Sequence, residues 1–168
     1  MKDDGIRERQ NGSKVGAVMV VGGGIAGMQA ALDLANSGFK VYLIEETTAI
    51  GGRMAQLDKT FPTNDCSMCL ISPKLIEVDK HLNIELITNA KVQSIDGEGG
   101  NFKVRVRKKP RFIDLKKCNA CGDCAIVCPV NLPNEFEQGL GPRKAVYKLY
   151  PQAVPSAYAI SKTARPPC

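Results

Sequence analysis

Residues 16–46, "GAVMVVGGGIAGMQAALDLANSGFKVYLIEE", decide the fold of this chain. Their first part, Ala17–Val21, is a short apolar run that ends in glycines, which is typical of a strand buried on both faces of a parallel sheet. Residues 25–36 are rich in Ala, Leu, Met and Gln, which are good helix formers, and Gly38 predicts where that helix ends. Residues 41–44 predict a second buried strand. The stretch therefore predicts a strand–helix–strand unit of an α/β fold.

Three glycines with the spacing G-x-G-x-x-G join the first strand to the helix. Gly22 permits a tight turn, Gly24 lets the backbone approach a pyrophosphate, and Gly27 lets the helix pack against the strand. The helix N-terminus would supply N–H groups to the phosphates. Glu45 ends the second strand, where a carboxylate can accept hydrogen bonds from ribose hydroxyls. The dinucleotide contacts predicted in this unit are Gly22, Gly24, Ile25, Ala26, Gly27, Glu45 and Glu46.

A second glycine pair follows this acid closely, in "IEETTAIGGRM" at residues 44–54. The segment resembles the flavoprotein pattern in which a second glycine pair lies near the diphosphate of FAD. This resemblance favours FAD over NAD. It adds four predicted cofactor contacts, Gly51, Gly52, Arg53 and Met54.

The middle of the chain predicts a third parallel strand followed by a small antiparallel element. Residues 47–66 look like an irregular connection, and a short helix is expected after Pro73. Residues 83–88 and 91–96 read as strands. In residues 102–107 Phe102, Val104 and Val106 alternate with three cations, Lys103, Arg105 and Arg107. That alternation is typical of a half-buried strand with a solvated face.

Composition and charge exclude several classes of protein. The net charge is +6, but no aromatic residues interleave with the bases, so a nucleic-acid site is not expected. The longest apolar run, Ala17–Val21, is far shorter than the roughly 20 residues of a membrane-spanning helix. Residues 1–14 are expected to be flexible and lack the apolar core of a signal peptide, which predicts a cytoplasmic protein. Seven cysteines in such a chain favour metal or redox chemistry over a disulfide framework.

Four of the cysteines lie in "CNACGDCAIVCP", residues 118–129, with the C-x2-C-x2-C-x3-C-P spacing of bacterial ferredoxins. Zinc is less suitable, because its sites need paired CxxC or His elements and the single histidine, His81, is far away in the sequence. The predicted ligands of a [4Fe-4S] cluster are Cys118, Cys121, Cys124 and Cys128. Either all four hold one cluster, or Cys128 serves a second cluster, for which Cys168 is another candidate ligand.

Another pair, Cys66 and Cys69, lies in "NDCSMCLISPKL" at residues 64–75. Three interpretations are open. The pair could ligate or support an iron–sulfur cluster, it could be a dithiol that exchanges electrons with the flavin, or it could be two structural thiols of the kind often found buried. The order of glycine pair and cysteines resembles the pyridine-nucleotide disulfide oxidoreductases, although the spacing between the cysteines differs.

Several segments in the same order resemble the A-type polypeptide of heterodisulfide reductase, the iron–sulfur flavoprotein of methanogens and other anaerobes. They are "GGGIAGMQAALDLA", "GGRMAQLDKTFPTNDCSMCLISPKL", "GNFKVRVRKKPRFID", the four-cysteine run and "LYPQAVPSAY". The resemblance implies a Rossmann-like FAD domain of thioredoxin-reductase type that is interrupted by an inserted ferredoxin-like module. It also implies electron transfer between FAD and [4Fe-4S] clusters in flavin-based electron bifurcation. The implied partners are B-type and C-type subunits, and hydrogenase or formate dehydrogenase subunits.

The expected organisation has three parts. A flexible N-terminus, 1–14, precedes a partial FAD-binding domain at 15–110, and a partial ferredoxin-like segment with a proline-rich tail covers 111–168. Members of the family are much longer and the tail "SKTARPPC" differs from theirs, so a truncated or fused reading frame is expected. Two other functions are considered, a disulfide oxidoreductase that works through Cys66 and Cys69, and a ferredoxin-like carrier with a vestigial flavin site.

Overall fold

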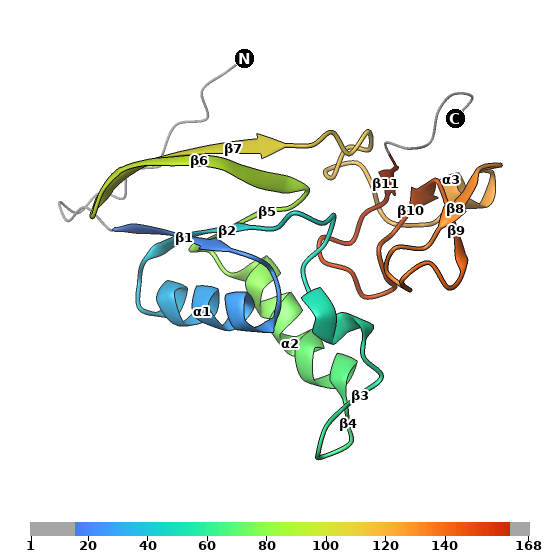
Figure 1. The fold of residues 1–168 in the computed structure, drawn as a ribbon, viewed down its shortest axis with the longest axis horizontal. Helices are drawn as coiled ribbons and strands as arrows, with labels where there is room; N and C mark the ends of the chain where they lie inside the picture. The colour runs from blue at the N-terminus through green and yellow to red at the C-terminus, as the bar shows by residue number, and fades with distance from the viewer. Residues whose placement is uncertain (1–15, 162–168) are drawn as a thin grey trace.

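The fold is built on a three-stranded parallel sheet, seen in a computed structural model that describes residues 16–161 (Figure 1). Its strands are β1 (Ala17–Val21), β2 (Lys40–Ile44) and β5 (Ile84–Ile87), in the order β1-β2-β5. Helices α1 (Ile25–Asn36) and α2 (Ser67–Lys80) lie on one side of this sheet, and a long β-hairpin lies on the other side (Figure 1). The predicted strand–helix–strand unit and third parallel strand are therefore confirmed.

The main hydrophobic core lies between the sheet and the two helices. Helix α1 contributes Met28 and Leu32, and the central strand β2 contributes Val41 and Leu43. The prediction of strands buried on both faces is right for β2 and wrong for β1. Strand β1 is paired only with β2 among the described residues, so it forms an edge of the sheet, and its Val21 is 60% exposed.

Helix α2 is longer than the sequence predicts. It begins at Ser67 and contains Pro73, whereas a short helix after the proline was expected. Proline has no N–H for the bond to the fourth residue before it and costs about 3 kcal/mol inside a helix. Ile71, Leu75 and Val78 recur on one face and are fully buried, and this burial outweighs the cost. The connection before the helix also contains short elements, namely η1 (Gly52–Gln56), β3 (Lys59–Thr60) and β4 (Asp65–Cys66).

The antiparallel element is the hairpin of β6 (Ala90–Glu98) and β7 (Asn101–Lys108), as predicted. The expected half-buried face is not observed. Of its three apolar residues only Val104 is partly buried, while Phe102 is 61% exposed. Since few described residues pack against this face, the alternating pattern marks an apolar surface and not a core.

The last part of the described chain consists of short segments, as the prolines predict. Helix α3 (Asp123–Ile126) is followed by two pairs of strands. They are β8 (Asn131–Pro133) with β9 (Pro142–Lys144) and β10 (Val146–Tyr147) with β11 (Ala159–Ile160). A second, small core forms here around the buried residues Cys128, Ala145 and Val146.

The main core also contains residues that lie beyond residue 110, where a domain boundary is predicted. Tyr150 and Ala153, which come after the four-cysteine run, are buried in the main core beside α1 and β2. The chain therefore leaves the first unit after the hairpin and returns to it near residue 150. Within residues 16–161 no helix has both the length and the apolar character needed to cross a membrane.

Candidate cofactor site

The first glycine segment lies at the carboxyl end of β1. Gly22 has a φ of +103° and donates from its N–H to the Ile44 carbonyl oxygen at 2.8 Å. A Cβ atom on Gly27 would overlap the Gly22 carbonyl oxygen, so only glycine lets α1 approach the loop this closely. By contrast, a Cβ atom on Gly24 would have no neighbour within 4 Å. The loop is therefore tight on its helix side and open at Gly24, which fits the approach of a diphosphate.

The second glycine pair packs directly against the first segment. The Gly51 N–H donates to the Gly23 carbonyl oxygen at 2.7 Å. Gly52 has a φ of +58°, and a Cβ atom there would lie 2.8 Å from the Gly24 Cα. The two segments, which the sequence predicted from separate motifs, thus form one continuous backbone surface. Arg53 and Met54 follow on η1, where the Arg53 Nη1 donates to Gln56 Oε1 at 3.0 Å.

Glu45 uses its carboxylate to hold this surface together. Its Oε2 accepts from the Gly23 N–H at 2.6 Å, and its Oε1 accepts from the N–H and the hydroxyl of Thr47 at 2.7 and 2.8 Å. The side chain therefore links the ends of β1 and β2. Its predicted contact with a ribose stays a prediction.

Glu46, also a predicted cofactor contact, forms ion pairs with the hairpin. Its Oε1 lies 3.2 Å from Lys109 Nζ and 3.6 Å from Lys91 Nζ. The hydrogen bond from Lys109, together with the charges of both lysines, lowers the pKa of the Glu46 carboxyl. In the structure Glu46 therefore joins the end of β2 to the antiparallel element.

Two open pockets lie at the carboxyl end of the parallel strands, where ligands of open α/β sheets bind. The smaller one, of about 320 Å³, is lined by β1, β2 and the start of β6, and Gly22 and Glu45 contribute to it. The larger one, of about 590 Å³, extends from Glu45 to residues 135–150. The predicted contacts that line one or both pockets are Gly22, Glu45, Glu46, Gly52 and Arg53, and those that line neither are Gly24, Ile25, Ala26, Gly27, Gly51 and Met54.

Tyr150 closes the larger pocket from the far side, and sequence reasoning missed it. Its hydroxyl donates to the Ile50 carbonyl oxygen, next to the second glycine pair, and its ring stacks on Phe136 with 5.2 Å between centroids. Burial raises the pKa of Tyr150 to about 12. A backbone bond of 2.8 Å from the Ile50 N–H to the Val154 carbonyl oxygen fixes the same contact. The sequence did point to the segment "LYPQAVPSAY", because it resembles the A-type polypeptide of heterodisulfide reductase. That resemblance gave no role for Tyr150.

Arg111 is a second residue that the sequence did not single out, because it ends a charged run. Its guanidinium Nη2 donates to the Thr48 carbonyl oxygen and, at 3.0 Å, to Thr88 Oγ1. Its Nη1 is buried and has no hydrogen-bond partner. Burial lowers the pKa of Arg111, while the Tyr147 and Cys118 side chains oppose this shift through their charge. Arg111 therefore connects the ends of β2 and β5 to the start of the four-cysteine segment.

The four predicted cluster ligands are placed unequally. Cys118 is partly buried, Cys121 and Cys124 are exposed, and Cys128 is 5% exposed in the small core. Between residues 16 and 161 no three Cys, His, Asp or Glu side chains are grouped so that they could hold a metal ion. None of the four forms a disulfide, so the donor set, four thiols at ferredoxin spacing, fits an iron–sulfur cluster in its chemistry. The structure does not bring the four sulfur atoms together, and their assignment as ligands stays a prediction.

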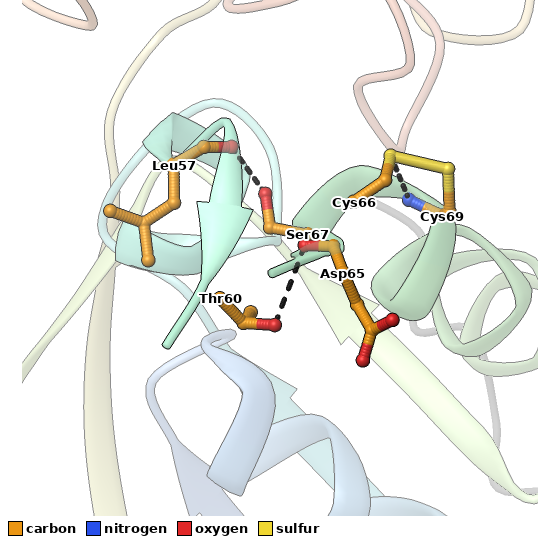
Figure 2. The surroundings of a disulfide bond; sticks show 6 residues. All are labelled: Leu57, Thr60, Asp65, Cys66, Ser67 and Cys69. Atoms are coloured by element: carbon orange, nitrogen blue, oxygen red, sulfur yellow. Dashed lines mark hydrogen bonds between the residues drawn. A yellow bond between two sulfur atoms is a disulfide. The ribbon is translucent and has the colours of Figure 1, made fainter. Parts of the chain in front are cut away.

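Cys66 and Cys69 form a disulfide with 5.2 Å between their Cα atoms (Figure 2). Both residues are exposed, which does not match the interpretation as buried structural thiols. Cys66 is the N-cap of α2, and its sulfur accepts a hydrogen bond of 3.2 Å from the Cys69 N–H. Neither cysteine lines either of the two pockets described above, and the cluster and flavin interpretations stay predictions. Cys168 lies outside the described residues.

Comparison with protein families gives two consecutive matches. The model of the FAD-dependent oxidoreductases matches residues 17–109, and that of the 4Fe-4S binding domain matches residues 111–133. The chain therefore belongs to the FAD-dependent oxidoreductase family and carries a 4Fe-4S binding segment behind its FAD segment. The predicted α/β fold class, the oxidoreductase class and the two cofactors are confirmed at this level.

Its relatives are A-type polypeptides of heterodisulfide reductases. The chain is 59% identical over 142 residues to an A-type iron–sulfur polypeptide of the CoB–CoM heterodisulfide reductase of Methanopyrus kandleri, a match that covers 84% of this chain and 22% of the relative. It is 58% identical over 144 residues to the A-type polypeptide of the H(2):CoB-CoM heterodisulfide,ferredoxin reductase of Methanothermobacter marburgensis, where the match covers 86% and 22%. The predicted resemblance is confirmed. The chain spans about a fifth of the length of these relatives.

Among solved structures, thioredoxin reductase of Lactococcus lactis is 25% identical with a TM-score of 0.46, covering 57% of this chain and 32% of the other. L-proline dehydrogenase of P. horikoshii is 27% identical with a TM-score of 0.47, covering 57% and 20%.

Proposed function

We propose that this chain is the electron-transfer part of an oxidoreductase that moves electrons between FAD and a [4Fe-4S] cluster, as part of a complex like heterodisulfide reductase. One observation carries the proposal. The chain segment that follows the four cysteines returns to the two glycine segments and forms the far wall of the larger pocket, through Phe136 and Tyr150. The flavin site and the cluster segment would therefore share one wall.

In this proposal the backbone of the two glycine segments binds the FAD diphosphate. Open space at Gly24 and the N-terminus of α1 favour a negatively charged group there. Glu45, already held by Gly23 and Thr47, presents its remaining acceptor positions at the pocket. FAD itself, when bound, would supply the electron chemistry, and the protein orients it and excludes water.

Cys118, Cys121, Cys124 and Cys128 would hold the cluster. Cys128 is anchored in the small core beside Ala145 and Val146, which gives the run one fixed end. Arg111 connects this region to the carboxyl ends of β2 and β5 through Thr48 and Thr88. A partly buried cation at this junction favours the electron-rich state of a nearby cluster, since cluster potentials depend on local charge and burial.

The relatives are subunits of reductases, which supports a role for this chain in a complex with other subunits. We propose B-type and C-type subunits as partners, and hydrogenase or formate dehydrogenase subunits as electron donors. The positive net charge of +6 favours an acidic docking face on a redox partner. A cytoplasmic location is part of the same proposal.

The test is anaerobic reconstitution of the full chain, followed by measurement of iron, acid-labile sulfide and FAD. About four irons and one FAD per chain are expected for a single cubane beside one flavin. After chemical reduction of the flavin, a cluster signal in electron paramagnetic resonance should appear without a mediator. Iron without flavin would leave a ferredoxin-like carrier, and flavin without iron would overturn the cluster assignment.

A further inference from the structure

We propose that Cys66 and Cys69 form a thiol–disulfide exchange site at the surface, at which Cys66 reacts with the thiolate of an external thiol or protein dithiol. This goes beyond the electron transfer proposed above, because it needs neither FAD nor the four-cysteine run. Neither cysteine lines either of the two pockets described at the carboxyl edge of the sheet. The pair lies instead where the short β3–β4 hairpin meets α2, at the end of the molecule opposite the β6–β7 hairpin (Figure 1).

The first argument is access. Both cysteines are exposed, and so are the apolar side chains of Phe61 and Leu70, the former at 97%. Exchange requires that the attacking thiolate, the sulfur it attacks and the sulfur that leaves lie nearly in line, which a buried disulfide prevents. Leu70 directly follows Cys69 in the chain, so this exposed disulfide has an apolar side chain next to it and can accept such an approach from another polypeptide.

The second argument is the difference between the two sulfur atoms. Cys66 is the N-cap of the fourteen-residue helix α2, and its sulfur accepts from the Cys69 N–H at 3.2 Å (Figure 2). In the reduced pair this N–H and the positive end of the helix stabilise the Cys66 thiolate. No acidic residue lies in the first turn of α2 to oppose this effect. Figure 2 shows the carboxylate of Asp65 pointing away from both sulfur atoms.

The third argument is the rigid support beneath the pair. Ser67, between the two cysteines, is fully buried, and its hydroxyl donates to the Leu57 carbonyl oxygen (Figure 2). The Thr60 hydroxyl donates to the Asp65 carbonyl oxygen at 3.4 Å. These bonds hold the backbone on both sides of Cys66 while the sulfur atoms remain accessible. The disulfide can therefore open and close without rearrangement of the helix start.

The reaction balances as a two-electron exchange. An external thiolate attacks the Cys66 sulfur, a mixed disulfide forms, and the Cys66–Cys69 bond breaks to release the Cys69 thiolate, which takes up a proton. A second external thiolate then attacks the external sulfur of the mixed disulfide and releases the Cys66 thiolate. The external dithiol is oxidised to a disulfide and the pair is reduced. In the opposite direction the reduced pair reduces an external disulfide.

Peptide mass spectrometry of the reconstituted full chain tests the site, because cleavage after Lys59 and Lys74 isolates both cysteines from the four-cysteine run. After reduction, Cys66 should react with iodoacetamide at pH 7 at least about ten times faster than Cys69, as expected for a stabilised thiolate. Cys69→Ser has lost its own disulfide, so glutathione disulfide is added as the oxidant: this variant should accumulate a mixed disulfide on Cys66 and release one glutathione thiol, whereas the matched variant Cys66→Ser should not. In the unsubstituted chain the Cys66–Cys69 disulfide itself is the oxidant for an added thiol. Glutathione and a thioredoxin variant that lacks its resolving cysteine, used in separate arms, distinguish a small thiol from a protein partner.

Two results would overturn the proposal. One is a pair that resists both reductants or whose cysteines react at equal rates. The other is protection of both cysteines from alkylation only after iron is incorporated, which would make them cluster ligands. Iron and FAD contents measured in Cys66→Ser distinguish a failure of the exchange site from a failure of the proposed electron-transfer function. They should equal those of the unsubstituted chain, and a loss of iron counts against the exchange site alone.

Discussion

The two cofactor segments differ in how far the polypeptide alone organises them. The glycine segments are in contact through a 2.7 Å bond from Gly51 to Gly23, and Glu45 and Tyr150 support them from both sides. In the cysteine run, Cys128 is buried while Cys121 and Cys124 face outward. A nucleotide site is made of backbone, which strands and helices fix, whereas a cluster site is made of side chains that gather when bonds to the metal form.

Among the substitutions that test this difference between the glycine segments and the cysteine run, Gly27→Val should have the largest effect. The new side chain would overlap the Gly22 carbonyl oxygen and force α1 away from β1. We expect a loss of more than about 3 kcal/mol in unfolding free energy and no bound FAD, while the iron content per chain remains. Urea unfolding and cofactor analysis measure both. Gly24→Ala is the matched control, because its Cβ atom has open space, so stability should be kept and only FAD affinity should fall.

Substitution of the cysteines tests whether the four-cysteine run is organised before metal binds. Cys124→Ser, at an exposed position, should abolish the cluster with almost no effect on the stability of the metal-free chain. Cys128→Ser should abolish the cluster and also cost about 1–3 kcal/mol, because a hydroxyl replaces a thiol in the small core. Iron analysis and thermal unfolding of the metal-free proteins distinguish the two. Equal stability losses would mean that no member of the run is fixed before metal binds.

A smaller effect should come from the titration of Tyr150. Its folded pKa, about 12, lies above the ordinary value of 10.0, so its contribution is fully present below pH 10 and is lost as the pH rises towards 12. In that window the unfolded chain has released the proton that the folded chain still holds. The loss should be about 2 kcal/mol. It should be absent in Tyr150→Phe, which loses about 1 kcal/mol at neutral pH with its bond to Ile50. Urea unfolding of both proteins from pH 8 to 12 measures the difference, and parallel curves would refute it.

The smallest effect is expected at Glu46. Lys109 and Lys91 lower the pKa of this exposed carboxyl, so its contribution to stability is present above the ordinary value of 4.5 and is lost as the pH falls through the lowered value. Glu46→Gln should have a slightly lower melting temperature than the unsubstituted chain at pH 7 and low salt, and the two should converge in acid or at high salt. If FAD affinity falls while the melting temperature stays the same, Glu46 contacts the cofactor instead of the hairpin.

Local sequence patterns predicted the strand–helix–strand unit and its glycine turn well. Apolar runs, the three glycines and the helix formers of residues 25–36 act between near neighbours, so the sequence displays them directly. Helix α2 was underestimated, because Pro73 suggested a start that the buried face of Ile71 and Leu75 overrides. Burial was also predicted wrongly for Val21 and Phe102, which are exposed, because burial depends on what packs above a strand.

Long-range contacts were outside what the sequence could predict. Neither the packing of Gly51 on Gly23 nor the bond from Tyr150 to Ile50 has a local signature. Arg111 looked like one more cation in a solvated run, and only the fold shows its guanidinium between Thr48 and Thr88. The cysteine spacing predicts the type of metal centre, but it does not predict how the thiols are arranged without the metal.

The hydroxyl bond between Tyr150 and Ile50 joins residues 100 positions apart, and the four cysteines lie between them in the chain. This distance sets an order of events during synthesis. The second glycine turn leaves the ribosome first and the cysteine run follows, and Tyr150 arrives only after both. Closure of so long a loop is slow compared with local helix formation. A nascent chain therefore exposes all four thiols to the machinery that delivers iron and sulfide before its flavin pocket has a far wall.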